Sequence, residues 1–72
     1  MLKVIGKGSM HQFSREIVLD NQIHVNDLPG LLQMPEELSD NLVVVRGHLK
    51  LDSNDLLFTE DEIFIFLAVM GG

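Results

Sequence analysis

Hydrophobic residues near the start of the chain are grouped as expected for a β-hairpin. Residues 2–5 form a short run rich in β-branched side chains that ends at Gly6, and a second strand-like segment at residues 15–19, which is apolar in its last three residues, precedes a turn-like Asp-Asn pair. Both runs have the length and composition of strands. Residues 6–12 are too many for a two-residue turn but suit a mobile hairpin loop. The pattern therefore predicts two paired strands joined by this loop.

A change from strand-like to helix-like spacing follows the hairpin. Asn26 or Asp27 can cap a helix through a side-chain oxygen. Pro35 cannot donate the backbone hydrogen bond that would continue a helix, so the helix should stop near Met34. The apolar residues of this segment fall at the i, i+3 and i+4 positions of one helical face: Leu28, Leu31 and Leu32. One short helix with a single apolar stripe is expected here.

The second half of the chain carries three further strand signals. Residues 35–41 are polar and predict a turn or a single helical turn, after which residues 42–46 have strong strand character. Residues 48–51 alternate polar with apolar, as in a half-buried edge strand. The acidic turn at residues 59–62 leads into residues 63–67, where apolar side chains occupy both faces of the pleat. The last strand is therefore expected to be apolar on both sides.

The order of these elements predicts an α+β domain. One main helix packs on one face of a mixed sheet of four to five strands. The chain has 72 residues, of which 46% are hydrophobic, and this length fits one domain spanning residues 1–72. A domain of this size buries only about 60% of the surface that its unfolded chain exposes, so an enzyme-sized buried cleft is not expected.

The last strand poses a choice between its two faces. If the helix covers only one face of the sheet, residues of opposite parity cannot all lie beneath it. Either Ile63 and Ile65 or Phe64 and Phe66 must then point outward. We predict that the two isoleucines face the helix, and that Phe66, with help from Phe64, forms an exposed patch for docking a partner.

Charge and composition exclude several classes of function. Eleven acidic residues against five basic ones give a formal net charge of -6. Such a chain repels phosphate backbones and anionic lipids, so neither nucleic acid nor membrane is expected as a partner, whereas a basic protein surface would be attracted. The longest apolar run, residues 63–70, is far shorter than the ~20 residues of a membrane span. No signal-peptide pattern is present, so a cytoplasmic location is expected.

The remaining polar residues do not form a recognisable catalytic or metal site. His11, His24 and His48 have no metal-ligand spacing, and the chain has no Cys to join them. The acidic residues at 60–62 are consecutive, so their side chains diverge, and they suit a solvated turn that faces a basic partner. The serines lack a nucleophile-elbow pattern. We therefore assign no catalytic residue, no metal and no bound cofactor.

The chain ends in Gly71 and Gly72, and its terminal carboxylate could be activated for acyl transfer. Two adjacent terminal glycines arise by chance in only about 0.5% of chains. Transfer of an adenylyl group from ATP to the terminal carboxylate would make a mixed anhydride that sulfide or a persulfide can attack, as the first step toward a thiocarboxylate on Gly72. Because glycine has no Cβ, its backbone can pass through a narrow opening into a partner's active site. From Val69 to Gly72 an extended tail spans roughly 13 to 14 Å.

In these features the sequence resembles the ubiquitin-like sulfur-carrier family, the β-grasp proteins that include ThiS and MoaD. The resemblance covers the element order of the whole chain and is sharpest in residues 59–66, followed by residues 69–72. Relatives often have prolines before the diglycine, where this chain has Leu67 and Ala68. This departure leaves the predicted fold intact but gives no choice between subfamilies.

The resemblance implies a co-substrate and not an enzyme. A ThiF/MoeB-like activating enzyme would use ATP to adenylate Gly72, and a downstream synthase would accept sulfur for a molybdopterin, thiamin-type or other sulfur compound. The resemblance also implies that residues 69–72, with Val69, Met70 and Gly71 leading to Gly72, form a flexible tail, and that the free protein is a monomer. Phe64 and Phe66 would dock the partner.

Other interpretations of the same residues remain open. The activated Gly72 could instead be joined to lysine amines of target proteins, as in ubiquitin-like modifiers, since both functions need the same tail and activation step. The domain could also be a non-covalent binding module that uses only its sheet surface. An ordinary frayed chain end would explain the two glycines without any chemistry.

Overall fold

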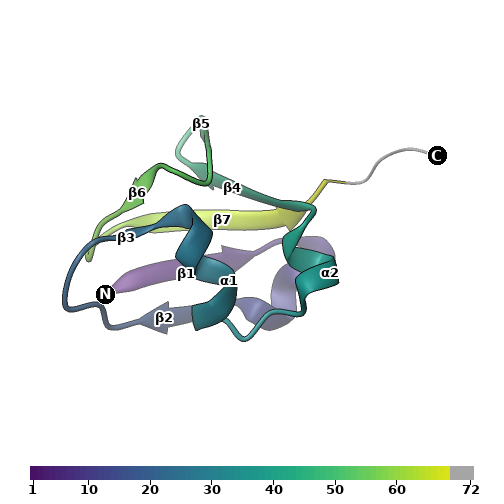
Figure 1. The fold of residues 1–72 in the computed structure, drawn as a ribbon, viewed down its shortest axis with the longest axis horizontal. Coiled ribbons are helices and arrows are strands. Elements are labelled where there is room, and N and C mark those ends of the chain that lie inside the picture. The colour runs from purple at the N-terminus through teal and green to yellow at the C-terminus, as the bar shows by residue number, and fades with distance from the viewer. Residues whose placement is uncertain (69–72) are drawn as a thin grey trace.

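The computed structural model describes residues 1–68, so the predictions that concern Val69, Met70, Gly71 and Gly72 lie outside the described residues. Its main element is a mixed five-stranded sheet with the strand order β2-β1-β7-β4-β5 (Figure 1). The strands are β1 (Leu2–Gly6), β2 (Arg15–Ile17), β4 (Leu42–Arg46), β5 (Leu49–Leu51) and β7 (Glu62–Leu67). The predicted α+β class and the predicted number of strands are confirmed.

The last strand lies at the centre of this sheet. β7 runs parallel to β1, with Gly6 opposite Ile65, and antiparallel to β4, with Val44 also opposite Ile65. The β1–β7 pair is the parallel pair of the sheet, while β1–β2 and β4–β5 are antiparallel. β7 is hydrogen-bonded to a neighbouring strand at each edge. Its side chains therefore point either to one face of the sheet, in the core, or to the other face, at the surface.

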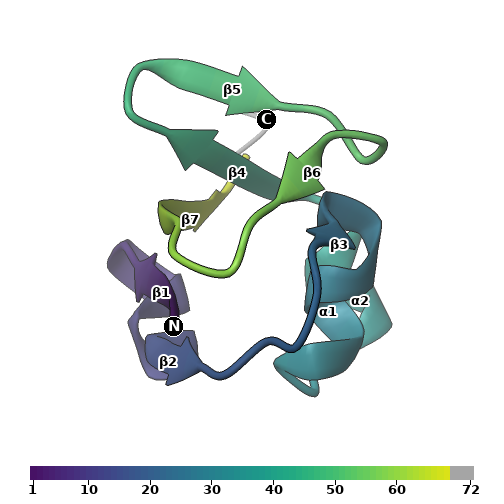
Figure 2. The same ribbon diagram turned by 90° about the vertical axis from the view of Figure 1, so that its left-hand side faces the viewer.

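Short helices cover one face of the sheet (Figure 2). They are the 3-10 turn η2 (Val25–Asp27), α1 (Leu28–Leu31) and α2 (Glu36–Ser39). The core between helices and sheet is built from buried apolar side chains of nearly every element: Leu2, Val4, Met10, Val25, Leu28, Leu32, Met34, Val44, Leu51, Leu57, Ile63 and Ile65. No helix within residues 1–68 is both long and apolar enough to cross a membrane.

The predicted single helix is wrong in its extent. The segment is divided into η2 and the four-residue α1, and α2 follows as a separate turn, as the polar pattern allowed. α1 ends because Gln33 adopts a left-handed conformation with φ 55. The N–H groups of Gln33 and Met34 donate to the carbonyls of Gly30 and Pro29 at 3.2 and 2.9 Å, which is the pattern of a Schellman motif. The motif returns Met34 to the core before Pro35 is reached.

The predicted capping residue Asp27 acts on a different element. The Asp27 carboxylate accepts a hydrogen bond from the backbone N–H of His24 at 3.1 Å, while α1 itself has no side-chain cap. The aspartate therefore stabilises the 3-10 turn η2 that precedes α1.

The hairpin at the start of the chain is confirmed, but two of its details are wrong. β2 ends at Ile17 and not at residue 19, because Ile17 pairs with Leu2, the first residue of β1, and no strand residue is left to pair with those that follow. The expected mobile loop contains the 3-10 helix η1 (Gly8–Phe13), which buries Met10 completely. Met10 and the partly buried Phe13 both pack this segment against the core.

A small second sheet was not predicted. β3 (Ile23–His24) pairs antiparallel with β6 (Leu56–Leu57), and Leu57 is fully buried. Two-residue strands are too short to show alternation, so the sequence pattern gave no signal. In contrast, β4 matches its predicted bounds, and β5 lies at an edge of the sheet as expected, with Leu51 buried and Leu49 exposed.

Candidate functional site

The two faces of β7 differ as predicted. Ile63 and Ile65 are fully buried beneath the helices. Phe64 and Phe66 have the opposite parity and point to the helix-free side of the sheet, where Phe64 is half-buried and Phe66 is 38% exposed. The facing of these side chains is therefore confirmed, while their role in docking a partner stays a prediction.

Neighbouring strands extend this aromatic pair into a larger apolar area. Val43 lies opposite Phe66, and Val45 lies opposite Phe64 on β4, while Ile5 lies beside Phe64 on β1. All three added side chains are only partly buried. We call these five residues the outer patch: Ile5, Val43, Val45, Phe64 and Phe66. Contiguous apolar surface of this kind often marks an interaction site.

Sequence reasoning missed three members of the outer patch. Residues 42–45 are all apolar, so alternation along β4 alone does not tell which of them face outward. Their facing follows from the register against β7, which places Val44 against the buried Ile65. Ile5 needs the β1–β7 pairing in the same way. A sequence signal was present only in β7, because both parities there carried large apolar side chains.

Lysine side chains surround the outer patch. The Lys7 ammonium lies 5.0 Å from the centroid of the Phe64 ring, within the range of a cation–π interaction. Lys50, on the edge strand β5, is exposed and lies opposite Val45. Lys3, at the far end of β1, pairs with Glu16 on β2 and Glu62 on β7. Three of the five basic residues of the chain thus lie on the helix-free side of the sheet.

The acidic turn before β7 has a structural role that the sequence did not indicate. The Asp61 carboxylate accepts hydrogen bonds from the backbone N–H of Phe58 at 2.8 Å and from the Arg46 guanidinium at 3.0 Å. The Asp61 side chain is only 18% exposed. Glu60 pairs with the ammonium group of Met1 at 3.0 Å. The expectation of a solvated acidic turn facing a basic partner is therefore wrong for Asp61, which holds the turn that starts β7.

No enclosed catalytic group is found elsewhere in residues 1–68. None of the polar or charged residues in this range is buried, and no group of three or more potential metal ligands gathers there. His11, His24 and His48 are exposed, as expected for surface histidines. A shallow hollow between η1 and the end of α1 has Arg15 and Gln33 at its rim, but nothing in it resembles a catalytic arrangement.

The last described residue of the chain is fixed to the sheet. The Ala68 N–H donates to the carbonyl of Asn41 at 2.8 Å, just after β7 has paired Leu67 with Leu42 on β4. The chain therefore reaches residue 68 at the same end of the sheet as Phe66 and Lys7. Any group carried by the four residues beyond Ala68 is attached next to the outer patch.

No protein-family model matches the chain, and no curated protein matches it at a significant level.

Proposed function

We propose that this chain is a ubiquitin-like β-grasp sulfur carrier, similar in action to ThiS and MoaD. A mixed sheet whose first and last strands are parallel neighbours, covered on one face by short helices, is compatible with a β-grasp fold. The chain would act in the cytoplasm as a free monomer and would be consumed and regenerated as a co-substrate.

The observation that carries the proposal is the juxtaposition along β7. The strand presents Phe64 and Phe66 on an uncovered face, and only Leu67 and Ala68 separate it from the sequence Val69-Met70-Gly71-Gly72. A partner that docks on the outer patch would therefore receive the diglycine segment directly at its own surface. Docking surface and reactive end belong to one continuous segment.

The chemistry requires that Gly72 carry the free terminal carboxylate. A carboxylate oxygen attacks the α-phosphorus of ATP, and pyrophosphate leaves. The sulfur of a sulfide donor then attacks the acyl carbon and AMP leaves, so that Gly72 ends as a thiocarboxylate. The activating enzyme supplies the acid, base and metal groups for both steps. The absence of buried polar side chains in residues 1–68 is compatible with this division of labour.

The direct test is intact mass of the full chain after incubation with ATP, sulfide and a ThiF/MoeB-like activating enzyme. We expect an acyl-adenylate first, and then replacement of one oxygen by sulfur at the C-terminal residue. ATP–pyrophosphate exchange measures the first step alone. A chain that gains neither AMP nor sulfur with any activating enzyme tried would contradict the proposal. Linkage of Gly72 to lysine amines in cell lysate would instead identify a protein modifier.

Replacing Phe66 with alanine tests the docking face. Loss of an aromatic anchor from an interface costs about 2 kcal/mol or more. Affinity for the activating enzyme should therefore fall about 30-fold, measured by calorimetry or as the KM for the carrier. Because Phe66 is 38% exposed, its removal should cost less stability than the ~3–5 kcal/mol of a fully buried Phe. Chemical denaturation checks that the variant stays folded.

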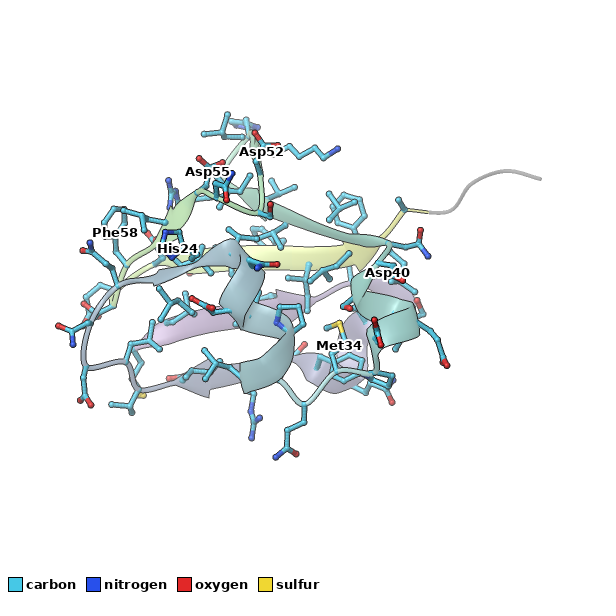
Figure 3. All side chains as sticks on the ribbon, viewed as in Figure 1. His24, Met34, Asp40, Asp52, Asp55 and Phe58 are labelled. Carbon is cyan, nitrogen blue, oxygen red and sulfur yellow. The ribbon has the colours of Figure 1, made fainter. Side chains whose placement is uncertain are left out.

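Phe58→Ala is the matched control for this variant. Phe58 is 45% exposed, but it precedes the turn before β7, at the other end of the strand from Leu67 (Figure 3). We expect this control to keep wild-type affinity. Wild-type affinity of a folded Phe66→Ala variant, or equal loss of affinity in both variants, would show that the outer patch is not the docking surface.

A further inference from the structure

The charges of the chain are distributed unevenly over the two sides of the sheet. The formal net charge is -6, yet Lys3, Lys7 and Lys50 lie on the helix-free side. On the helix side, α2 carries Glu36 and Glu37 and is followed by Asp40, and all three are exposed (Figure 3). A partner that contacts the outer patch therefore meets a different charge from the one that the whole molecule carries.

The cross-strand register divides the helix-free side into two parts. At the start of β1 and β7, Lys3 lies between Glu16 and Glu62, so its positive charge is opposed by two carboxylates. Opposite charges that face each other across strands attract locally, but two carboxylates outweigh one ammonium group. This end of the sheet is therefore negative on balance and does not favour an acidic partner.

The other end, which carries the outer patch, lacks such compensation. One row across the sheet consists of Ile5, Phe64, Val45 and Lys50, and the next row contains Phe66 and Val43 beside Lys7. The paired residues of these rows include no acidic side chain, and the acidic residue that follows β5 is the exposed Asp52, two residues after Lys50. Within residues 1–68, neither Lys7 nor Lys50 takes part in an ion pair. The two ammonium groups thus flank the outer patch without a carboxylate in direct contact in the described part of the chain.

Screening decides which charges a docked partner experiences. At physiological ionic strength the Debye length is about 8 Å, so carboxylates on the far side of the helices are largely screened at the outer patch. Lys7 is also held in place by its contact with the Phe64 ring. Lys7 and Lys50 outnumber the neighbouring carboxylate of Asp52, so the local environment of a partner seated on the patch is positive on balance, although the chain as a whole is acidic.

From this arrangement, and resting on the proposed function, we infer that the activating enzyme meets the outer patch with an apolar surface flanked by carboxylates that face Lys7 and Lys50. This partner chemistry is the opposite of the basic surface that the net charge alone suggests. A second copy of this chain would bring lysines against lysines if the two outer patches met, which disfavours that pairing.

Charge reversal at Lys50 tests the inference, with the activating enzyme that adenylates the wild-type chain as the probe. Lys50→Glu should weaken binding about tenfold, because a charge at the rim of an interface is turned from attractive to repulsive. Lys7→Glu should act in the same direction. Wild-type binding should weaken with added salt.

Arg15→Glu is the matched control. It produces the same change in net charge on an exposed strand residue, but Arg15 pairs with the buried Val4 and therefore lies on the helix side of the sheet. We expect it to bind within about twofold of wild type, because its side chain lies on the opposite face of the sheet from Lys7 and Lys50 and does not face the docked partner. Circular dichroism confirms that all variants are folded.

The possible outcomes separate this inference from the proposed function. Wild-type adenylation with unchanged or tighter binding of Lys50→Glu and Lys7→Glu would overturn the inference and leave the carrier function intact. Equal weakening by Arg15→Glu would also overturn it, since net charge would then be the cause. Failure of every activating enzyme to adenylate the wild-type chain would refute both together. Dimerisation of the wild-type chain that is lost in Phe66→Ala would identify a second copy as the occupant and would overturn the inference.

Discussion

Replacing Gly6 with alanine is expected to destabilise the domain by about 3 kcal/mol or more, within the range of overpacking combined with loss of a core methionine. A Cβ at this position would overlap the carbonyl oxygen of Met10 and would lie 2.5 Å from its carbonyl carbon and 3.0 Å from the backbone nitrogen of His11. These are backbone atoms, so no side-chain rotation can relieve the overlap. The 3-10 helix η1 would have to move away from β1.

Movement of η1 would disturb several interactions at once. Met10 is fully buried, and the Gly6 N–H donates to the Ser14 hydroxyl oxygen at 2.8 Å. Gly6 is also the residue that pairs with Ile65 on β7. A domain of 72 residues has a total stability of roughly 4 to 11 kcal/mol. The substitution therefore removes a large share of it, which urea denaturation would measure as a lower midpoint.

Gly30→Ala provides the control for this prediction. Gly30 lies within α1, and a Cβ there would have no heavy atom within 4 Å. Alanine is favoured over glycine in helices by about 1 kcal/mol, so this variant should be as stable as wild type or slightly more stable. Similar midpoints for the two variants would show that η1 can yield without cost, and that the close approach at Gly6 is unimportant.

The strands of the main sheet could be predicted because their signals are local. Residues 2–5, 42–46 and 63–67 are runs of β-branched and aromatic side chains, and these preferences act without tertiary contacts. The structure places a strand at each of them. β2 came out shorter than predicted because its length depends on where β1 begins, which is a property of the pair and not of residues 15–19 alone.

The details that were predicted wrongly depend on packing and backbone contacts that hydrophobic spacing does not reveal. The loop after β1 is fixed by burial of Met10 against a glycine four positions earlier, and hydrophobic spacing within the loop does not show this. The helix is interrupted at Gln33, a residue type that seldom adopts positive φ, because the Schellman motif returns Met34 to the core. Asp61 looked like part of a solvated turn until Arg46, from another strand, was placed beside it.

In the candidate site, too, the features with a local sequence signal were predicted, and those that depend on strand register were not. Phe66 could be placed outward from sequence because β7 is apolar at both parities, so that one set had to remain uncovered. The facing of Val43, Val45 and Lys50 required the register of three strands. Their gathering beside Phe64 and Phe66 turns a pair of aromatic residues into a patch with positive flanks. Gly72, the residue with the proposed chemistry, stays a prediction from sequence alone.

Deletion of Gly72 is expected to abolish adenylation while leaving the fold unchanged. The proposed reaction occurs at the terminal carboxylate, and removal of one residue withdraws it by about 3.3 to 3.6 Å. Since misplacement of a reacting group by about 1 Å can cost 100-fold in rate, the loss should be at least about 100-fold. Stability should not change, because the last buried core residue within residues 1–68 is Ile65 and deletion of a glycine removes no side chain. ATP–pyrophosphate exchange and thermal unfolding measure the two effects separately.

Two controls distinguish loss of chemistry from loss of docking. The deleted chain should still compete with the wild type for the activating enzyme, because the outer patch on β1, β4 and β7 is intact. A single bulky residue appended after Gly72 should also prevent adenylation, since the carboxylate would then belong to a residue with a side chain. If the deleted chain is adenylated as readily as the full chain, the carboxylate of Gly72 is not the acceptor and the carrier function fails. Competition without adenylation by the wild-type chain would instead favour a non-covalent binding module that uses the same face of the sheet.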